Sequence, residues 1–300
     1  MSITTAIVLG GLGAVGRLFR NLLADAGVLV KTVDQRRHAA LLKCDVCADV
    51  AHSSSEVLEA LVGTDVVIMA LPEAVALQAA PWVSQGMQAD ALLIDTLSIK
   101  TEICGLLSPL NNPRERLSLN PMFAPSLGVQ GQVIAAVEIT AGPLTKELMS
   151  LLNRAGATVE CISAEMHDKI TSATQVATHA AILAFGLTIR ELGYDSHTVW
   201  KLATPPHRIL LALLHRLISG SPEIYWDIQR YHGQSLLVRA KLQAAAASLN
   251  ETIERDDYVD FKHVLESLRT MLAPLDPDLL KVTERLMQSL NQFASRPIPP

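Results

Sequence analysis

Asn120 lies in the sequence Ser118-Leu119-Asn120-Pro121-Met122-Phe123-Ala124-Pro125 and has the most specific chemical consequences of any residue in the chain. Its side-chain amide offers one acceptor oxygen and two N–H donors. Because an amide does not take up a proton at neutral pH, Asn120 cannot act as a general base, but it can accept an N–H hydrogen bond and orient its donor. We therefore expect residues 118–125 to form a loop that positions a polar group of a substrate.

The motif Gly11-Leu12-Gly13-Ala14-Val15-Gly16 follows a short apolar run and opens a helical pattern. In this context Gly11 permits a tight turn, Gly13 lets the backbone approach a pyrophosphate, and Gly16 lets the helix pack on the strand. The helix N-terminus adds free N–H groups and a positive dipole for the phosphates. The motif therefore predicts a dinucleotide site.

Asp34 ends the next apolar run, at the position where a carboxylate accepts hydrogen bonds from a ribose diol and repels a 2′-phosphate. This favours NAD as the cofactor. Arg36 and Arg37 follow closely and could instead hold that phosphate, so NADP stays open.

Two more segments are expected at the carboxyl ends of strands, the edge where an open sheet binds its ligands. Met69-Ala70-Leu71-Pro72 is expected beside the nicotinamide. The second segment, Asp95-Thr96-Leu97-Ser98-Ile99-Lys100, brings Ser98 to the same edge. Alone, Ser98 is an ordinary loop serine.

Four polar residues, Asp168, Ser172, Gln175 and His179, are spaced by four, three and four positions in an otherwise apolar helical segment. At 3.6 residues per turn this spacing places them on one narrow face. A buried polar stripe needs hydrogen-bond partners, and a substrate cleft can provide them. The alternative is a packing seam that is bonded internally.

Arg208 and Arg216 are the candidate anion ligands, because a guanidinium grips a carboxylate with two parallel hydrogen bonds. Arg216 follows the strongly apolar residues 209–214. Metal-ligand spacing does not group the neighbouring histidines, so no metal is expected, and His207, His215 and His232 are interpreted as structural.

The first half of the chain alternates apolar runs with helical patterns, which is typical of parallel strands joined by crossover helices. We predict strands at residues 5–9, 28–33, 65–70, 91–94 and, from a weaker pattern, 132–140. Helices are predicted at 14–26, 55–61, 73–84 and 143–154. The predicted fold class is thus α/β, with an N-terminal Rossmann-type dinucleotide-binding domain over residues 1–162.

Residues 163–300 show helical patterns almost to the end and predict an all-helical second domain. Breaks are expected at Gly193, at the prolines 205–206, at residues 220–222, at Gly233 and at residues 274–277. Ser221 followed by Pro222 is a favourable helix start.

Composition narrows the class of protein. A length of 300 residues with 49% hydrophobic and 18% charged residues suits a two-domain globular chain. A net charge of −5 without a long basic run argues against nucleic acid as a partner. Residues 170–189 contain no charged side chain, but their polar groups argue against a membrane span, and a buried helix that lines a cleft is expected instead. No signal peptide precedes the first strand, so a cytoplasmic location is expected. Cys44 and Cys47 are the one close pair of cysteines, and we interpret them as ordinary thiols.

Taken together, the glycine motif, Asp95–Lys100, Asn-Pro-Met, His167-Asp168 and the Arg216 region resemble the prephenate/arogenate dehydrogenases over nearly the whole chain. The resemblance implies an NAD-dependent oxidative decarboxylation of a small dicarboxylate by a homodimer. It implies that Ser98 bonds the group at substrate C4, that Lys100 is structural, and that Arg216, with Arg208 as a plausible second, binds a carboxylate. Gln175 and His179 match later substrate-site positions of the family, and Met122 belongs to the matched loop.

That family carries a histidine, its catalytic base, where this chain has Asn120. The variant Leu-Asn-Pro-Met-Phe-Ala-Pro is similar to the branch that acts on 4-amino-4-deoxyprephenate and forms p-aminophenylpyruvate for p-aminophenylalanine and antibiotic pathways. A neutral amine at C4 can itself drive hydride out and leave an iminium, so a base becomes less necessary. A prephenate enzyme lacking its base would lose roughly 10² to 10⁴ in rate.

Two alternatives stay open. The chain could be an ordinary prephenate or arogenate dehydrogenase of tyrosine biosynthesis that uses another base, such as His179. It could also be a non-catalytic dinucleotide-binding paralogue in which the histidine was lost with activity. Arg216, Ser98 and the polar helix residues argue against the second, because a decayed site would not retain the family's motifs.

Overall fold

The computed structural model describes residues 2–35, 44–110 and 114–294 and contains two compact units. The first comprises the chain up to Ser172 together with Trp226–His232. The second comprises Ala173–Tyr225 and the chain from Gly233 onward. The expected domain boundary after residue 162 remains a prediction, and each unit is described separately below.

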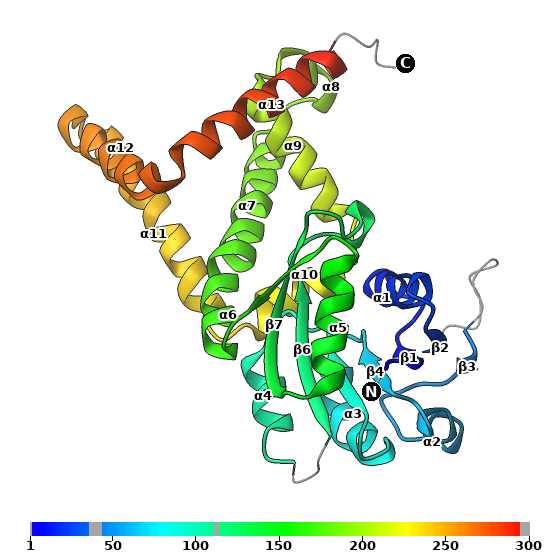
Figure 1. Cartoon of the computed structure of the whole chain (residues 1–300). Helices are drawn as coiled ribbons and strands as arrows, with labels where there is room; N and C mark the ends of the chain where they lie inside the picture. The colour runs from blue at the N-terminus through cyan, green and yellow to red at the C-terminus, as the bar shows by residue number, and fades with distance from the viewer. Residues whose placement is uncertain (1, 36–43, 111–113, 295–300) are drawn as a thin grey trace. The chain divides into compact units, whose positions relative to one another are not determined.

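Within the described residues, the first unit is built on an eight-stranded sheet in the order β3-β2-β1-β4-β5-β6-β7-β8. The strands are β1 (Thr5–Leu9), β2 (Leu29–Asp34), β3 (Val46–Cys47), β4 (Val66–Met69), β5 (Leu92–Asp95), β6 (Glu115–Pro121), β7 (Val133–Thr140) and β8 (Thr158–Cys161). The helices of this unit are α1 (Ala14–Asp25), α2 (Ser55–Leu61), α3 (Glu73–Gly86), α4 (Thr101–Leu107), α5 (Pro143–Arg154), α6 (Ala164–Thr171) and the last residues of α10 (Pro222–Tyr231) (Figure 1). This confirms the Rossmann-type fold.

Alternating side chains on the strands create a separate core on each face of the sheet. On β1, Ile7 and Leu9 belong to the core under α2, α3 and α4, whereas Ala6 and Val8 belong to the core under α1 and α5. Both faces are covered, which explains why these strands read as continuous apolar runs. The five predicted strands and four predicted helices are present, with end shifts of one or two residues.

The strands β1 to β6 run parallel to one another, so their carboxyl ends lie along the same side of the sheet. β1 pairs with β2 on one side and with β4 on the other, which is the topological switch point where such sheets bind ligands. β5 pairs with β4 and β6 in parallel, so the ends of β4, β5 and β6 succeed one another along this edge.

β6 corrects the expectation that residues 118–125 form a loop. Ser118 to Pro121 are the last residues of this strand, and Asn120 pairs with Ala135 of the antiparallel strand β7. Only the residues after Pro121 leave the sheet, through a short 3₁₀ turn, η1 (Pro125–Leu127). Asn120 is therefore held by a ladder on a rigid element.

The described part of the second unit is helical throughout, which confirms that prediction. Its elements are η2 (Ser172–Ala177), α7 (Thr178–Glu191), α8 (Ser196–Leu202), α9 (Pro205–Ile218), the first residues of α10 (Pro222–Tyr231), α11 (Ser235–Glu254), α12 (Tyr258–Leu272), η3 (Ala273–Leu275) and α13 (Asp276–Ala294). The helices break at the predicted glycines and prolines, and Pro205 and Pro222 each occupy a helix start.

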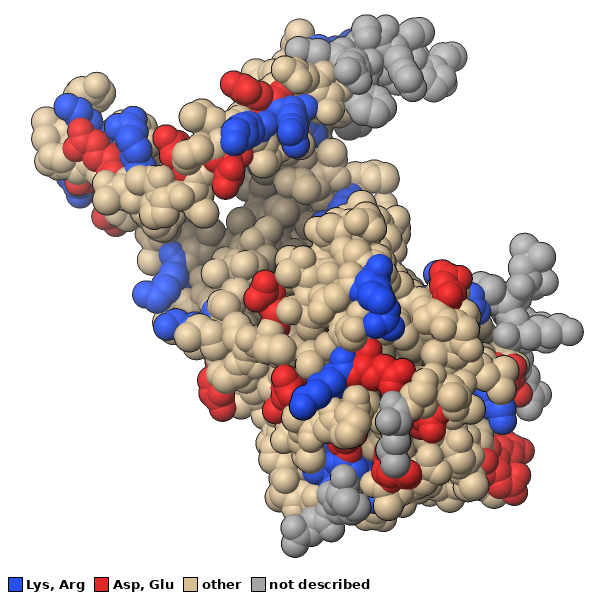
Figure 2. Space-filling model, viewed as in Figure 1, with Lys and Arg blue, Asp and Glu red and all other residues tan. Residues whose placement is uncertain are grey.

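Much apolar surface of the second unit is exposed in the single chain. On α11 the exposed side chains include Leu236, Leu237 and Ile253, and α12 exposes Leu268 and Met271. Figure 2 shows basic and acidic side chains in small mixed groups between uncharged areas on the face drawn.

The helical run Ala164–Glu191 is long and apolar enough, by length and composition alone, to cross a membrane. Only 22% of its most apolar window is buried inside the chain. The expectation of a buried helix is therefore wrong for the single chain.

Candidate active site

The turn between β1 and α1 forms a tight cradle of backbone groups. Gly10 adopts a left-handed φ of 82°, so it makes the sharp turn that was expected of Gly11. A Cβ on Gly16 would lie 2.2 Å from the Gly10 carbonyl oxygen, so this glycine lets α1 approach the strand. A Cβ on Gly13 would meet only the Gly10 oxygen, at 3.2 Å, which leaves the outside of the turn clear for a phosphate.

Asp34 is buried at the end of β2 and accepts a hydrogen bond of 3.0 Å from the backbone N–H of Leu12 in the cradle. This bond ties the carboxylate to the glycine-rich turn, as the ribose-binding prediction requires. The cradle and Asp34 together fit a dinucleotide. Arg36 and Arg37, the residues that kept NADP open, lie outside the described residues.

A fully buried ion pair between Asp95 and Lys100 lies at the end of β5, and the lysine also bonds β6. The Lys100 ammonium lies 3.1 Å from Asp95 Oδ1 and donates a hydrogen bond of 2.8 Å to the carbonyl oxygen of Leu119, the residue before Asn120. A buried charge needs such partners to offset its desolvation. Lys100 thus fixes the strand that carries Asn120.

Asn120 is 3% exposed and begins a chain of hydrogen bonds. Its Nδ2 lies 3.0 Å from Nε2 of His167, and Nδ1 of His167 lies 2.8 Å from Oδ1 of Asp168. The backbone N–H groups of Lys100 and Thr101 donate to the Asp168 carboxylate at 2.8 Å each, and the Thr101 hydroxyl donates as well. Asp168 therefore connects α6 to the start of α4.

Burial alone would raise the pKa of Asp168. The hydrogen bonds from His167, from Thr101 and from the Lys100 backbone outweigh burial and lower that pKa to about 2. His232 is buried and its Nε2 lies 2.9 Å from the Asp168 carbonyl oxygen, which stabilises the backbone of α6 at this point. Burial lowers the pKa of His232 despite this bond.

The other predicted residues of the first unit follow the strand ends. Leu71 and Pro72 follow β4 and precede α3. Ser98 is half-buried three residues after Asp95, the last residue of β5. Met122 follows β6, and its backbone N–H donates to Val133 at 3.0 Å. These positions agree with a ligand at this edge.

In the second unit, His179 on α7 is half-buried and meets the Tyr225 ring edge-on, with centroids 5.1 Å apart. Burial and then the positive charge of Arg216 lower the pKa of His179, so it is neutral at pH 7. Arg216 on α9 is exposed and makes no ion pair with any described residue. These features suit a guanidinium that receives an anion.

Arg208 also lies on α9, but its guanidinium stacks over Trp200 at 5.3 Å from the ring centroid. Gln175 is half-buried in η2. The structure therefore groups His179 with Arg216 and pairs Arg208 with an aromatic ring.

The predicted single polar face needs correction. It assumed 3.6 residues per turn throughout, but η2 is a six-residue π-helix, which has more residues per turn. Two of the four side chains also have partners within the first unit: Asp168 binds the start of α4, and Ser172 Oγ donates to the Lys169 carbonyl. For these two residues the alternative of an internally bonded seam is correct.

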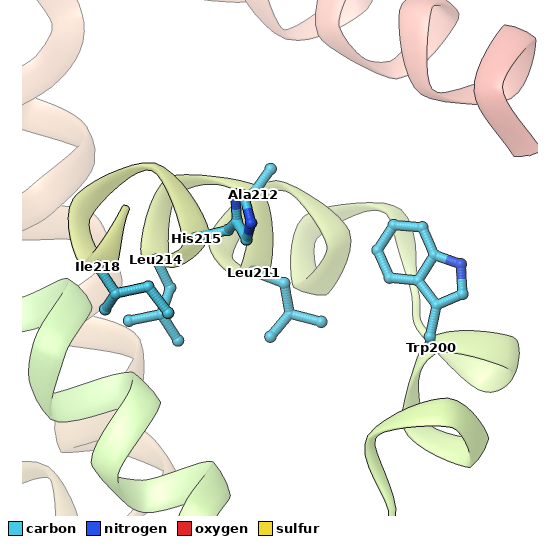
Figure 3. Close-up of a pocket in the computed structure, with 6 residues that line it drawn as sticks. All are labelled: Trp200, Leu211, Ala212, Leu214, His215 and Ile218. Carbon is cyan, nitrogen blue, oxygen red and sulfur yellow. The ribbon is translucent and has the colours of Figure 1, made fainter. Parts of the chain in front are cut away.

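A pocket of about 480 Å³ lies in the second unit, along α9 (Figure 3). Its lining is largely apolar and comprises Trp200, Leu211, Ala212, Leu214, His215 and Ile218. It contains none of the predicted site residues and does not suit a dicarboxylate.

Sequence reasoning identified His167 only as part of a motif match, placed Asp168 on a polar helix face, and interpreted His232 as structural. It did not identify Thr101 or Tyr225. The hydrogen bond from Asn120 to His167 joins residues 47 positions apart, which no local spacing indicates.

Comparison with known proteins identifies relatives of the whole chain. Residues 163–267 match the family model described as prephenate dehydrogenase, dimerization domain. The chain is 40% identical to 4-amino-4-deoxyprephenate dehydrogenase of Streptomyces pristinaespiralis over 286 residues, covering 95% of this chain and 97% of that protein. It is 26% identical to a probable arogenate/prephenate dehydrogenase of Methanocaldococcus jannaschii, covering 87% of this chain and 59% of the relative.

Two solved structures share the fold. Prephenate dehydrogenase from A. aeolicus, in complex with hydroxyphenyl propionate and NAD+, superposes with a TM-score of 0.71 at 16% identity, covering 92% of this chain and 99% of that one. Synechocystis arogenate dehydrogenase superposes with a TM-score of 0.62 at 14% identity, covering 91% of this chain and all of the other.

Proposed function

The chain belongs to the prephenate dehydrogenase family, and from that premise we propose that it oxidatively decarboxylates 4-amino-4-deoxyprephenate to p-aminophenylpyruvate with NAD. Asn120 is the observation that carries this proposal. It occupies a rigid strand end in place of the histidine base that the family motif resemblance implies there. The relative that is 40% identical and named for this substrate supports the same assignment.

When bound, NAD would accept the hydride that leaves C4. The neutral amine at C4 supplies the electron push and becomes an iminium, and loss of CO₂ from the ring then leaves the aromatic amine. The role left to Asn120 is to accept an N–H hydrogen bond and orient the amine. Arg216 would bind a substrate carboxylate, since its guanidinium has no carboxylate partner among the described residues.

The remaining roles rest on the family resemblance. We propose that Ser98 bonds the group at C4 and that Met122, Gln175 and His179 are substrate-binding residues. Arg208 is the weakest of these assignments, because its guanidinium already stacks on Trp200.

Asn120→His tests the assignment of the substrate. The variant should gain activity on prephenate and keep or lose activity on the amine, because only the hydroxyl reaction needs proton removal. A tenfold gain on prephenate would correspond to about 1.4 kcal/mol of transition-state stabilisation. Because the new histidine must be neutral to act as a base, that rate should rise with pH through its titration. No gain on prephenate would contradict the role given to position 120.

Asp34→Ala tests the cofactor. The wild type should prefer NAD, because the buried Asp34 carboxylate repels the 2′-phosphate of NADP. In the variant the difference in kcat/KM between NAD and NADP should become smaller. The measurement is kcat/KM for both cofactors, with Asp25→Ala, at the end of α1, as a control. A wild-type preference for NADP would refute the assignment.

We also propose that the protein is a cytoplasmic homodimer. The match of residues 163–267 to a dimerization domain supports the dimer, as do the exposed apolar side chains of α11 and α12. A second copy of the chain, bound through the same residues, would bury such an apolar surface.

Prephenate or arogenate dehydrogenase activity is the second candidate function. His179 supports it, since burial and Arg216 lower its pKa and leave it neutral, as a general base must be. In that case His179→Asn should abolish turnover of the hydroxylated substrate.

A further inference from the structure

We propose that Asp168 and His167 form a positioning relay that orients the Asn120 amide, so that Oδ1 and not the amide nitrogen faces the polar group at C4 of the substrate. The inference rests on the proposed function, because that function places Asn120 against C4. All three residues lie in the first unit.

The relay starts from a fixed carboxylate. Oδ1 of Asp168 accepts from the Lys100 N–H and Oδ2 accepts from the Thr101 N–H, each at 2.8 Å. With both oxygens bound to backbone groups, the carboxylate cannot rotate without losing bonds that cap α4. The low pKa of Asp168 keeps it ionised at neutral pH, so it acts only as an acceptor.

This carboxylate selects the tautomer of His167. Nδ1 lies 2.8 Å from Asp168 Oδ1, so Nδ1 carries the proton and donates it to the hydrogen bond. In a neutral imidazole the other nitrogen, Nε2, is then an acceptor. The ring has little freedom to turn, because His167 is only 2% exposed and each of its ring nitrogens has a hydrogen-bond partner, Asp168 at Nδ1 and Asn120 at Nε2.

The tautomer in turn selects one of two amide orientations of Asn120. The Asn120 Nδ2, which can only donate, lies 3.0 Å from the accepting Nε2. A half-turn of the amide would place Oδ1 against Nε2, two acceptors face to face, and would lose this bond. The backbone cannot shift to compensate, because Lys100 holds the Leu119 carbonyl and Ala135 pairs with Asn120. Oδ1 of Asn120 is therefore left to accept a hydrogen bond from an amine N–H.

A double-mutant cycle tests the relay, using whichever of 4-amino-4-deoxyprephenate, prephenate and arogenate the wild type oxidises fastest. His167→Leu should lower kcat about tenfold, the value of one hydrogen bond, with KM for NAD unchanged. In the Asn120→Ala background the same substitution should change kcat by less than about twofold. His167→Gln retains a hydrogen-bond acceptor, so its kcat should be close to that of the wild type.

Thr171→Val is the packing control, because it removes the hydroxyl contacts with the α6 backbone and with His232 Nε2 but leaves both ring nitrogens of His167 with their partners. The relay would be overturned if His167→Leu lowered kcat equally in the wild-type and Asn120→Ala backgrounds. It would also be overturned if Thr171→Val lowered kcat as much as His167→Leu does. Exchange of the Asn120 side-chain amide protons, followed by NMR, gives a readout without turnover. Their exchange should be faster in His167→Leu than in wild type, and an unchanged rate would also overturn the relay. A wild type that prefers prephenate refutes the proposed substrate but leaves the cycle interpretable.

Discussion

Arg216→Ala should lower kcat/KM for the substrate by between about thirtyfold and several thousandfold. The variant leaves a substrate carboxylate without its charged partner, which costs about 2 to 5 kcal/mol. The affinity for NAD should hardly change, since the cofactor cradle belongs to β1 and α1 and Arg216 lies on α9. Steady-state kinetics and NAD binding measured separately check both parts.

The matched control is Arg190→Ala. Arg190 is exposed on α7 and pairs with Glu191, so its loss should leave kcat/KM nearly unchanged. Arg216→Ala should also raise the pKa of His179, because it removes a positive charge that opposes protonation of the imidazole. If NAD binding fell as much as substrate binding, Arg216 would belong to the fold and not to substrate recognition.

Lys100→Ala should lower the free energy of unfolding by about 3 to 5 kcal/mol, because it leaves the fully buried Asp95 carboxylate unpaired. It also removes the donor to the Leu119 carbonyl that fixes β6 beside Asn120. Urea denaturation measures the loss. The double variant Lys100→Met with Asp95→Leu should recover much of it, since a buried pair can be replaced by apolar residues of similar volume.

Lys262→Ala is the control for this prediction. Lys262 is exposed and pairs with Glu266 one turn away, and such pairs contribute well under about 1 kcal/mol. A loss in Lys100→Ala no larger than that of Lys262→Ala would show that the buried pair does not hold β5 and β6 together.

The sequence predicted five strands from their apolar runs but missed β6, which begins with two charged residues. β6 begins with Glu115 and Arg116, which read as solvated residues, yet both are buried. Glu115 accepts from the backbone N–H groups of Leu144 and Thr145 at the start of α5, and Arg116 donates to the Leu110 carbonyl. Their partners come from distant parts of the chain, so no local pattern could indicate burial.

Similar limits applied to the site. Spacing and motif placed Asp34, Ser98 and Asn120 at one sheet edge, because strand order determines where the carboxyl ends meet. The contact of Asn120 with His167 depends on tertiary packing of α6, and the π-helix η2 departs from the ideal helix that the polar spacing assumed. The missed shorter elements, β3 and β8, lie at the two edges of the sheet, where half-exposed strands lose the apolar signal.

Asn120 marks an enzyme whose substrate carries an amine at C4. The most direct test of this assignment is NADH formation by the unmutated protein with 4-amino-4-deoxyprephenate, prephenate and arogenate under the same conditions. We expect kcat/KM for the amine to exceed that for the two hydroxylated substrates by about a hundredfold or more, the usual contribution of a positioned base that this chain lacks. Equal or more efficient turnover of prephenate or arogenate would contradict the account.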